Sequence, residues 1–152
     1  MPHLMDEIVF YAEGVPAPQG SKTHVGGGRL IESSRQVGPW RDAVRRAVGA
    51  MASRPPIEGP VHLVQVFALP RPKSHYGTGR NAGRIKRGAP SRPPVRPDLD
   101  KLTRAVGDAL TGICYHDDAQ VVNLCAAKYY VMPSGRLSMP GVEIRIHGEG
   151  CW

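Results

Sequence analysis

Apolar and polar residues alternate along several short stretches of the chain, and this two-residue period predicts β-strands. The clearest stretch runs from Pro60 to Leu69, where both alternating sets of positions are mainly apolar. A strand that is apolar on both faces belongs in the middle of a sheet. A first strand is predicted in DEIVFYAEGVPAP, and further strands in AQVVNLCAAKYYV and VEIRIH. The pattern therefore predicts a small sheet with residues 60–69 as a central strand.

Two other segments repeat their apolar residues at the spacing of an amphipathic helix. The first follows Pro39 in WRDAVRRAVGAMA, and its apolar stripe consists of Trp40, Val44, Ala47, Val48 and Met51. The second starts at Asp98, which suits the N-cap position, and stops at Gly112. Its buried face is predicted to contain Leu99, Leu102, Val106, Ala109 and Leu110. Each helix thus has one face to bury against the rest of the domain.

The segment from Arg71 to Arg96 has no regular pattern. It contains eight basic residues, four glycines and four prolines in twenty-six positions, and no acidic residue. Such a segment buries too little apolar surface to offset its ordering entropy, so we expect a loop that is mobile without a ligand. Its uniform positive charge suits contacts with phosphates, and the alternative is a passive linker. Another glycine-rich turn, at Gly26–Gly28, predicts either a hairpin or an irregular surface loop.

Composition and charge narrow the classes of function. The chain has 152 residues, 41% of them hydrophobic, which fits one domain with one core. No apolar run is long enough to span a bilayer and the N-terminus has no signal-peptide pattern, so we expect a soluble cytoplasmic protein. Three cysteines without a CxxC spacing favour reduced thiols over a disulfide framework or a zinc site. The formal net charge of +7 makes a polyanion, most commonly nucleic acid, the expected partner.

Acidic residues are concentrated in one region despite this positive charge. Five of the thirteen lie in RPDLDKLTRAVGDALTGICYHDD, namely Asp98, Asp100, Asp108, Asp117 and Asp118. The first two stand at the start of the second predicted helix, and the last two precede the next predicted strand. Each position also has a purely structural interpretation, because N-caps, first helical turns and tight turns all favour aspartate. Spacing alone leaves both interpretations open.

Considered together, these acidic residues indicate a metal-binding site, which none of them indicates alone. Two carboxylates at a helix start and a third at the next strand start can converge if the helix packs back beside that strand. Neighbouring carboxylates repel one another, and a hard divalent cation such as Mg²⁺ neutralises this repulsion through oxygen ligands. Such a cation can activate a water and stabilise the charge that develops on a phosphodiester. The sequence therefore predicts a metal pocket on a surface that binds DNA.

The same residues resemble the RusA family of Holliday junction resolvases. Its signature is approximately D-x-D-N-x-x-K, a short helix ending in D-A-L, then D-D-x-Q and a strand ending in Lys. The stretch RPDLDKLTRAVGDALTGICYHDDAQVVNLCAAK is similar to it, and GVPAPQGSK and the tryptophan helix are similar to phage-type members. The resemblance implies a single α/β domain over residues 1–152, with a small mixed sheet flanked by helices. It also implies a homodimer, encoded by a bacterium, phage or prophage, that nicks four-way DNA junctions with Mg²⁺ or, in its place, Mn²⁺.

The resemblance assigns site residues one position at a time. Asp98, Asp100 and Asp118 match the acids that are metal ligands and catalytic residues, and Arg104 stands where the family usually has a catalytic lysine. Lys101 replaces a common asparagine, and Arg104 keeps the charge of lysine but not its compact ammonium group. Basic residues that are candidates for contacts with DNA are Lys22, Lys73, Arg84, Lys86, Arg87, Lys101 and Lys128.

The remaining polar residues of the motif have two interpretations each. Asp117 is a supporting carboxylate or a turn residue, and Asp108 is a solvated side chain or a partner of Arg104. Gln120 is expected to buttress the acidic loop. The leading hypothesis is a Mg²⁺-dependent junction-resolving endonuclease. The alternatives are a basic DNA-binding module without catalysis and a nuclease for other branched DNA such as flaps or forks.

Overall fold

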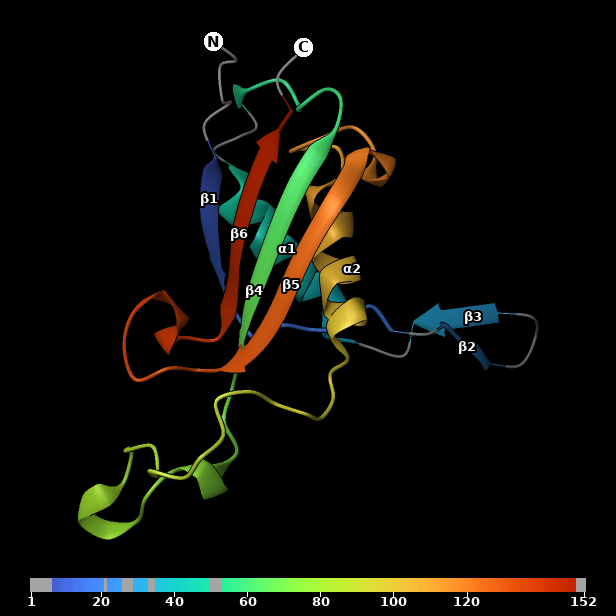
Figure 1. Ribbon diagram of the computed structural model, residues 1–152. Coiled ribbons are helices and arrows are strands. Elements are labelled where there is room, and N and C mark those ends of the chain that lie inside the picture. Colours follow the sequence, from blue (N-terminus) through green and yellow to red (C-terminus); the bar gives the residue numbers. More distant parts are fainter. Residues whose placement is uncertain (1–6, 21, 26–28, 33–34, 50–52, 150–152) are drawn as a thin grey trace.

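A four-stranded mixed sheet forms the centre of the protein (Figure 1). This computed structural model describes residues 7–20, 22–25, 29–32, 35–49 and 53–149. The strand order is β1–β6–β4–β5, with β1 spanning Ile8–Glu13, β4 Val61–Leu69, β5 Val121–Tyr130 and β6 Gly141–Gly148. β6 pairs antiparallel with both β1 and β4, whereas β5 pairs parallel with β4. The predicted α/β fold with a small mixed sheet is confirmed, as is the central position of residues 60–69.

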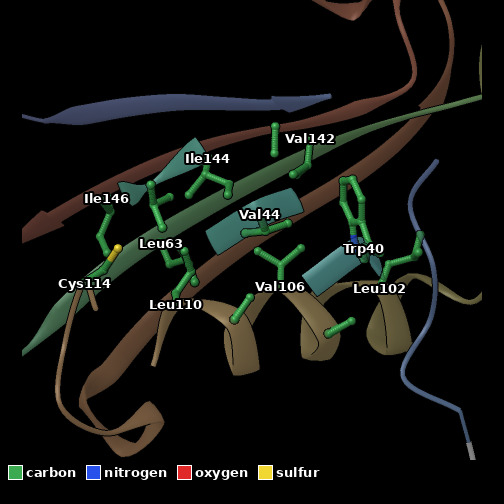
Figure 2. Packing of buried hydrophobic residues seen from close by; sticks show 14 of the residues in the cluster. Trp40, Val44, Leu63, Leu102, Val106, Leu110, Cys114, Val142, Ile144 and Ile146 are labelled. Atoms are coloured by element: carbon green, nitrogen blue, oxygen red, sulfur yellow. The ribbon is translucent and has the colours of Figure 1, made fainter. Parts of the chain in front are cut away.

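Two helices cover one face of this sheet, and the hydrophobic core lies between them and the strands (Figure 2). α1 spans Val37–Ala47 and α2 spans Leu99–Leu110. Figure 2 shows side chains of both helices pointing toward β4 and β6. It labels Trp40, Val44, Leu102, Val106 and Leu110 on the helices and Leu63, Ile144 and Ile146 on the strands. No helix in the described part of the chain is long and apolar enough to cross a membrane. The apolar faces of α1 and α2 that the sequence predicts are the faces that pack in this core.

The helix boundaries agree closely with the sequence prediction. α1 begins at Val37, before the predicted start, because the Val37 side chain is itself buried in the core. Trp40, Val44 and Val48 of its predicted stripe are buried, while Met51 lies outside the described residues. α2 follows Asp98, which occupies the N-cap position as predicted.

Two short paired strands lie on either side of the glycine-rich stretch near the N-terminus. β2 (Lys22–Val25) and β3 (Arg29–Glu32) form an antiparallel pair, which confirms the hairpin over the irregular loop. The predicted turn at Gly26–Gly28 lies outside the described residues. In Figure 1 this pair extends away from the main sheet on the side of α2.

Residues 71–96, here called the basic arm, project from the end of the sheet where β4 and β5 finish (Figure 1). Two 3₁₀ turns, Lys73–His75 and Gly79–Asn81, and a bridge between Tyr76 and Ile85 give the arm local structure. Its base is tied to β5, because the backbone N–H of Tyr130 donates to the carbonyl of Ser91 at 2.9 Å. The mobility expected for this segment stays a prediction.

Candidate active site

Asp98 and Asp100 stand at the N-terminal end of α2, and neither carboxylate is used to build the helix. Asp98 has the extended backbone of an N-cap residue, yet its side chain accepts no capping hydrogen bond. Its carboxylate is 53% exposed and lies 3.8 Å from the Nζ of Lys101. Asp100 is exposed in the first turn, where the positive end of the helix dipole favours negative charge. The capping explanation of Asp98 is therefore not supported, and both carboxylates remain free to bind a cation.

The second acidic motif is held in a tight hydrogen-bonded loop just before β5. The Asp117 carboxylate accepts from the backbone N–H of Ala119 at 2.8 Å and so caps the short 3₁₀ turn Asp118–Gln120. The Gln120 side-chain oxygen accepts from the N–H groups of His116 and Asp117. Its amide nitrogen donates to the carbonyls of Ile57 and Gly59. Asp117 is thus a turn residue, and the buttressing role expected of Gln120 is confirmed.

Asp118, like Asp117 before it, is exposed to solvent in this loop. The hydrogen bond from the Ala119 N–H lowers the pKa of Asp117. The hydrogen bond with Asp117 raises the pKa of Asp118, and the negative charges of Asp117 and Asp108 act in the same direction. A cation near Asp118 would relieve the same repulsion.

The structure separates Asp98 from Asp118 within one chain. α2 runs antiparallel to β5, so its N-terminus lies beside the end of the strand and its C-terminus lies beside the start, where Asp118 stands (Figure 1). The Nζ of Lys128, near the end of β5, bonds to the carbonyl of Pro97 at 2.9 Å. Lys128 follows Val121 by seven residues, about 23 Å of strand. Asp98 lies at the Lys128 end of β5 and Asp118 lies at its Val121 end, so the two aspartates are on the order of 15 Å or more apart.

Asp100 is also too far from Asp118 to share a metal with it in one chain. Asp108, the helical acid that raises the pKa of Asp118, follows Asp100 by eight residues, about 12 Å along α2. Oxygens that bind one Mg²⁺ lie about 2.1 Å from it, and so within about 4 Å of one another. Among the described residues, no three His, Cys, Asp or Glu side chains are grouped closely enough to hold a metal ion. The convergence expected of the three acids is therefore not met within a single chain.

A groove of about 330 Å³ follows α2 between its two acidic ends. One ridge of the helix supplies Asp100, Arg104 and Asp108, and the opposite side includes Asp118 and Leu124. Arg104 is exposed, and its guanidinium forms no ion pair with any residue the structure describes. Asp108 pairs instead with Arg41 of α1 at 3.8 Å, which corrects the expected pairing with Arg104. The groove thus offers a free guanidinium between two sets of carboxylates.

Gln65 is a buried residue of this groove that the sequence pattern places in a strand but does not assign to the site. Its side chain lies on β4 beneath α2 and is 1% exposed. Its amide nitrogen donates to the carbonyl of Thr103 at 3.3 Å, while its amide oxygen has no partner among the described residues. A buried polar residue on an otherwise apolar strand face is the sequence signal that could have identified it.

A larger cavity, of about 860 Å³, lies on the other side of the N-terminus of α2. Its walls are mainly apolar and come from the segment after β1, the end of β4 and the two ends of the basic arm. Asp98, Arg96 and Lys101 are the charged residues that line it. Asp98 therefore lines this cavity, whereas Asp100 lines the groove along α2.

The predicted DNA contacts are spread over three parts of the fold. Lys73, Arg84, Lys86 and Arg87 are exposed on the basic arm. Lys101 lies beside Asp98 on α2, and Lys22 lies in β2, where its side chain is outside the described structure. Lys128 is half-buried on β5 and bonds to backbone carbonyls. The exposed contacts therefore cluster on the arm and at the adjoining end of α2.

Comparison with known proteins identifies the family to which this chain belongs. The sequence matches the family described as Endodeoxyribonuclease RusA over residues 13–147. It is also 32% identical over 130 residues to the uncharacterized protein YqaN of Bacillus subtilis (strain 168), an alignment that covers 83% of this chain and 89% of that protein. The matched region contains strands β4 and β5, both helices, the basic arm and both acidic motifs. The chain belongs to the RusA family of endodeoxyribonucleases.

Proposed function

We propose that this protein is a Mg²⁺-dependent endodeoxyribonuclease that resolves Holliday junctions by paired symmetric nicks. The observation that carries the proposal is the combination of exposed carboxylates, Asp98 and Asp100 at one end of α2 and Asp118 at the other, with a basic arm beside the first pair. Carboxylate oxygens suit Mg²⁺ or Mn²⁺, and exposed lysines and arginines suit the phosphates of DNA. The family membership supports the nuclease activity, and the preference for four-way junctions is the finer part of the proposal.

Asp98, Asp100 and Asp118 are the residues that would hold the cation. Each carboxylate is exposed, and neither Asp98 nor Asp100 is committed to a structural hydrogen bond in the described structure. When bound, the cation would activate a water and stabilise charge on the scissile phosphate. Arg104 lies between the acidic ends and can contact that phosphate through its planar guanidinium. A guanidinium, unlike the ammonium group of lysine, does not serve as a proton donor, so the role open to Arg104 is contact with the phosphate.

The separation of the acids in one chain supports a homodimer in which each site combines residues of two chains. A single chain carries one Asp98–Asp100 pair at one end of α2 and one Asp118 at the other. A two-fold axis that reverses the direction of the second chain would bring Asp118 of the partner subunit toward Asp98 and Asp100. Two equivalent sites result, which is the number that paired nicks in opposing strands require.

The free edge of β5 is the surface that we propose for this dimer. β5 ends the sheet, and its Val122 and Leu124 side chains are 59% and 49% exposed. An unpaired apolar edge strand is a template for pairing with a second chain. Antiparallel pairing of two β5 strands about Cys125 would set the start of one strand beside the end of the other. This pairing would bring Asp118 of the partner subunit toward Asp98 and Asp100, as the shared site requires.

Cleavage of a labelled synthetic four-way junction tests the proposed activity. With Mg²⁺ the protein should nick two opposing strands symmetrically, and EDTA should stop the reaction. A panel of flap, fork and duplex substrates of equal length measures selectivity. Equal rates on flaps or forks would favour a general branched-DNA nuclease, and binding without cleavage at any Mg²⁺ or Mn²⁺ concentration would favour a non-catalytic module.

Cys125 offers a direct test of the proposed interface, because this thiol is exposed on β5. Antiparallel pairing at a two-fold axis places equivalent Cα atoms about 4.5–5.5 Å apart, within reach of a disulfide. Mild oxidation of a Cys151→Ser variant should therefore give a cross-linked dimer, and adding Cys125→Ser should prevent it. Dimers that form in solution without any Cys125 cross-link would show that another surface pairs.

A further inference from the structure

Lys128 makes contacts that separate it from the other basic residues of the chain. It pairs in register with Phe67, whose side chain is fully buried, so Lys128 lies on the helix-covered side of the sheet. Its Nζ donates to the carbonyl of Val95 at 2.7 Å and to the carbonyl of Pro97 at 2.9 Å. Two of its three donors are thus committed to backbone groups more than thirty residues away in the sequence.

The carbonyls of Val95 and Pro97 belong to the short segment that leads into Asp98. In the described structure, the Lys128 bonds are the hydrogen bonds that tie Val95 and Pro97 to the sheet. Asp98 has no capping bond of its own, so the course of the backbone into α2 decides where its carboxylate stands. Bonds from a charged donor are shorter and stronger than neutral ones, which suits Lys128 to fix that course.

We propose that Lys128 is a positioning residue of the nuclease site, which fixes the entry to α2 so that Asp98 and Asp100 can bind the cation. The proposal rests on the proposed function, because it concerns the same two carboxylates. It differs from a phosphate contact, which would leave the Lys128 ammonium directed to solvent. A phosphate contact contributes mainly to DNA affinity, whereas a positioning residue contributes mainly to cation affinity and cleavage.

Lys128 also ties the acids to the basic arm. Val95 is near the end of the arm, and the arm begins at Arg71, whose Nε donates to the carbonyl of Val131 at 2.9 Å. Both ends of the arm are therefore anchored within four residues of one another on β5 and the residue that follows it. Displacement of Val95 on loss of Lys128 would disturb Asp98 before it disturbs the tip of the arm.

The test compares Lys128→Met, which keeps the side-chain length but removes charge and donors, with Lys128→Arg, which keeps both. Mn²⁺ binding to the DNA-free protein is measured by calorimetry, and junction binding is measured in Ca²⁺ over a range of salt concentrations. We expect Lys128→Met to weaken Mn²⁺ binding and to raise the Mg²⁺ requirement of cleavage by about tenfold or more, within the range for residues that orient metal ligands. Its junction affinity and salt slope should remain those of the wild type, and Lys128→Arg should recover most of the cation affinity.

Lys73→Met is the matched control on the exposed part of the arm. It should show the opposite pattern, with normal Mn²⁺ binding and a salt slope reduced by about 0.9, the value for one phosphate that is no longer neutralised. If Lys128→Met instead binds Mn²⁺ normally and has a reduced salt slope, Lys128 is a phosphate contact and the proposal is wrong. Lys128→Gln, which retains one donor group, replaces Lys128→Met if the latter does not fold. A wild-type protein that neither binds Mn²⁺ nor cleaves junctions would refute the proposed function itself.

Discussion

The two acidic motifs of this protein differ in how their carboxylates are held. In the loop before β5, Asp117 and Gln120 form a closed set of hydrogen bonds that fixes the position of Asp118. At the start of α2, Asp98 and Asp100 make no such bonds, and their positions follow the backbone of the helix and of its entry segment, to which Lys128 donates. One motif is therefore fixed by side chains and the other by the backbone.

This difference separates residues that stabilise the fold from residues that are available for chemistry. A carboxylate that caps a turn contributes stability and is less free to bind another group. Exposed carboxylates without a structural bond contribute little to stability. Asp117 thus belongs to the first class, and Asp98 and Asp100 to the second. Asp118 shares features of both, since its loop is rigid but its own carboxylate faces solvent.

The largest expected effect comes from removing single charges at the free carboxylates. Asp98→Asn, Asp100→Asn and Asp118→Asn should each lower the cleavage rate about a thousandfold or more, because a lost metal ligand removes several kcal/mol of transition-state stabilisation. Junction binding should be retained or strengthened, since repulsion of phosphate falls. Rates are measured under single turnover on a labelled junction, with Asp108→Asn as the control. Near-normal turnover in any of the three would remove that residue from the site.

Removing the Gln120 hydrogen bonds in the loop before β5 should lower the stability of the fold as well as the activity. Gln120→Leu leaves two backbone N–H groups and the carbonyls of Ile57 and Gly59 without their partner. We expect the free energy of unfolding to fall by about 2–3 kcal/mol, measured by urea denaturation. Gln36→Leu, at a position where the glutamine makes no capping bond, is the control. An unchanged unfolding midpoint for Gln120→Leu would mean that the loop is not held as described.

The basic arm, unlike the two acidic motifs, is expected to set the salt dependence of DNA binding. Replacing Arg84, Lys86 and Arg87 together with alanine should reduce the slope of log affinity against log salt by up to about 2.7, or 0.9 for each phosphate that is no longer neutralised. Binding is measured in Ca²⁺ with a four-way junction. Replacing Arg45, Arg46 and Arg54, which are exposed elsewhere, removes the same charge and should change the slope less. An unchanged slope in the arm variant would make the arm a passive linker.

The smallest effect compares the two aspartates at N-cap positions. Asp117→Ala removes a capping bond and should lower the free energy of unfolding. Asp98→Ala removes no capping bond and should cost less than half of that, through the helix dipole alone. Chemical denaturation of the two variants side by side measures both values. Equal losses would restore Asp98 as a structural cap.

Much of this fold can be predicted from the sequence, because the deciding patterns are local. The apolar residues on both sides of 60–69 identify a central strand, and the period of 98–112 identifies a helix with the correct buried face. The sequence pattern puts the start of α1 too late, because Pro39 is a stronger local signal than the buried Val37. The contacts of Lys128 cannot be predicted, since its carbonyl partners lie on a segment without any regular pattern.

The candidate site is predictable in its residue types but not in its geometry. The sequence identifies acids at a helix start and a strand start, and local rules say nothing of the direction in which the helix passes the strand. That direction depends on β4 and β5 being parallel, which is a property of the whole sheet. It places the two acidic motifs at opposite ends of α2 and leads to the proposal of a site shared between two chains.

The most direct test of that central claim uses mixed dimers of two inactive chains. One chain carries Asp98→Asn with Asp100→Asn, the other carries Asp118→Asn, and mixed dimers are purified through two different tags. If each site combines both chains, one of the two sites in the mixed dimer has all three acids, so it should nick one strand of a junction at about the rate of a wild-type site. If each site lies within one chain, both sites lack an acid, and a mixed dimer that binds junctions but does not nick them would contradict the account.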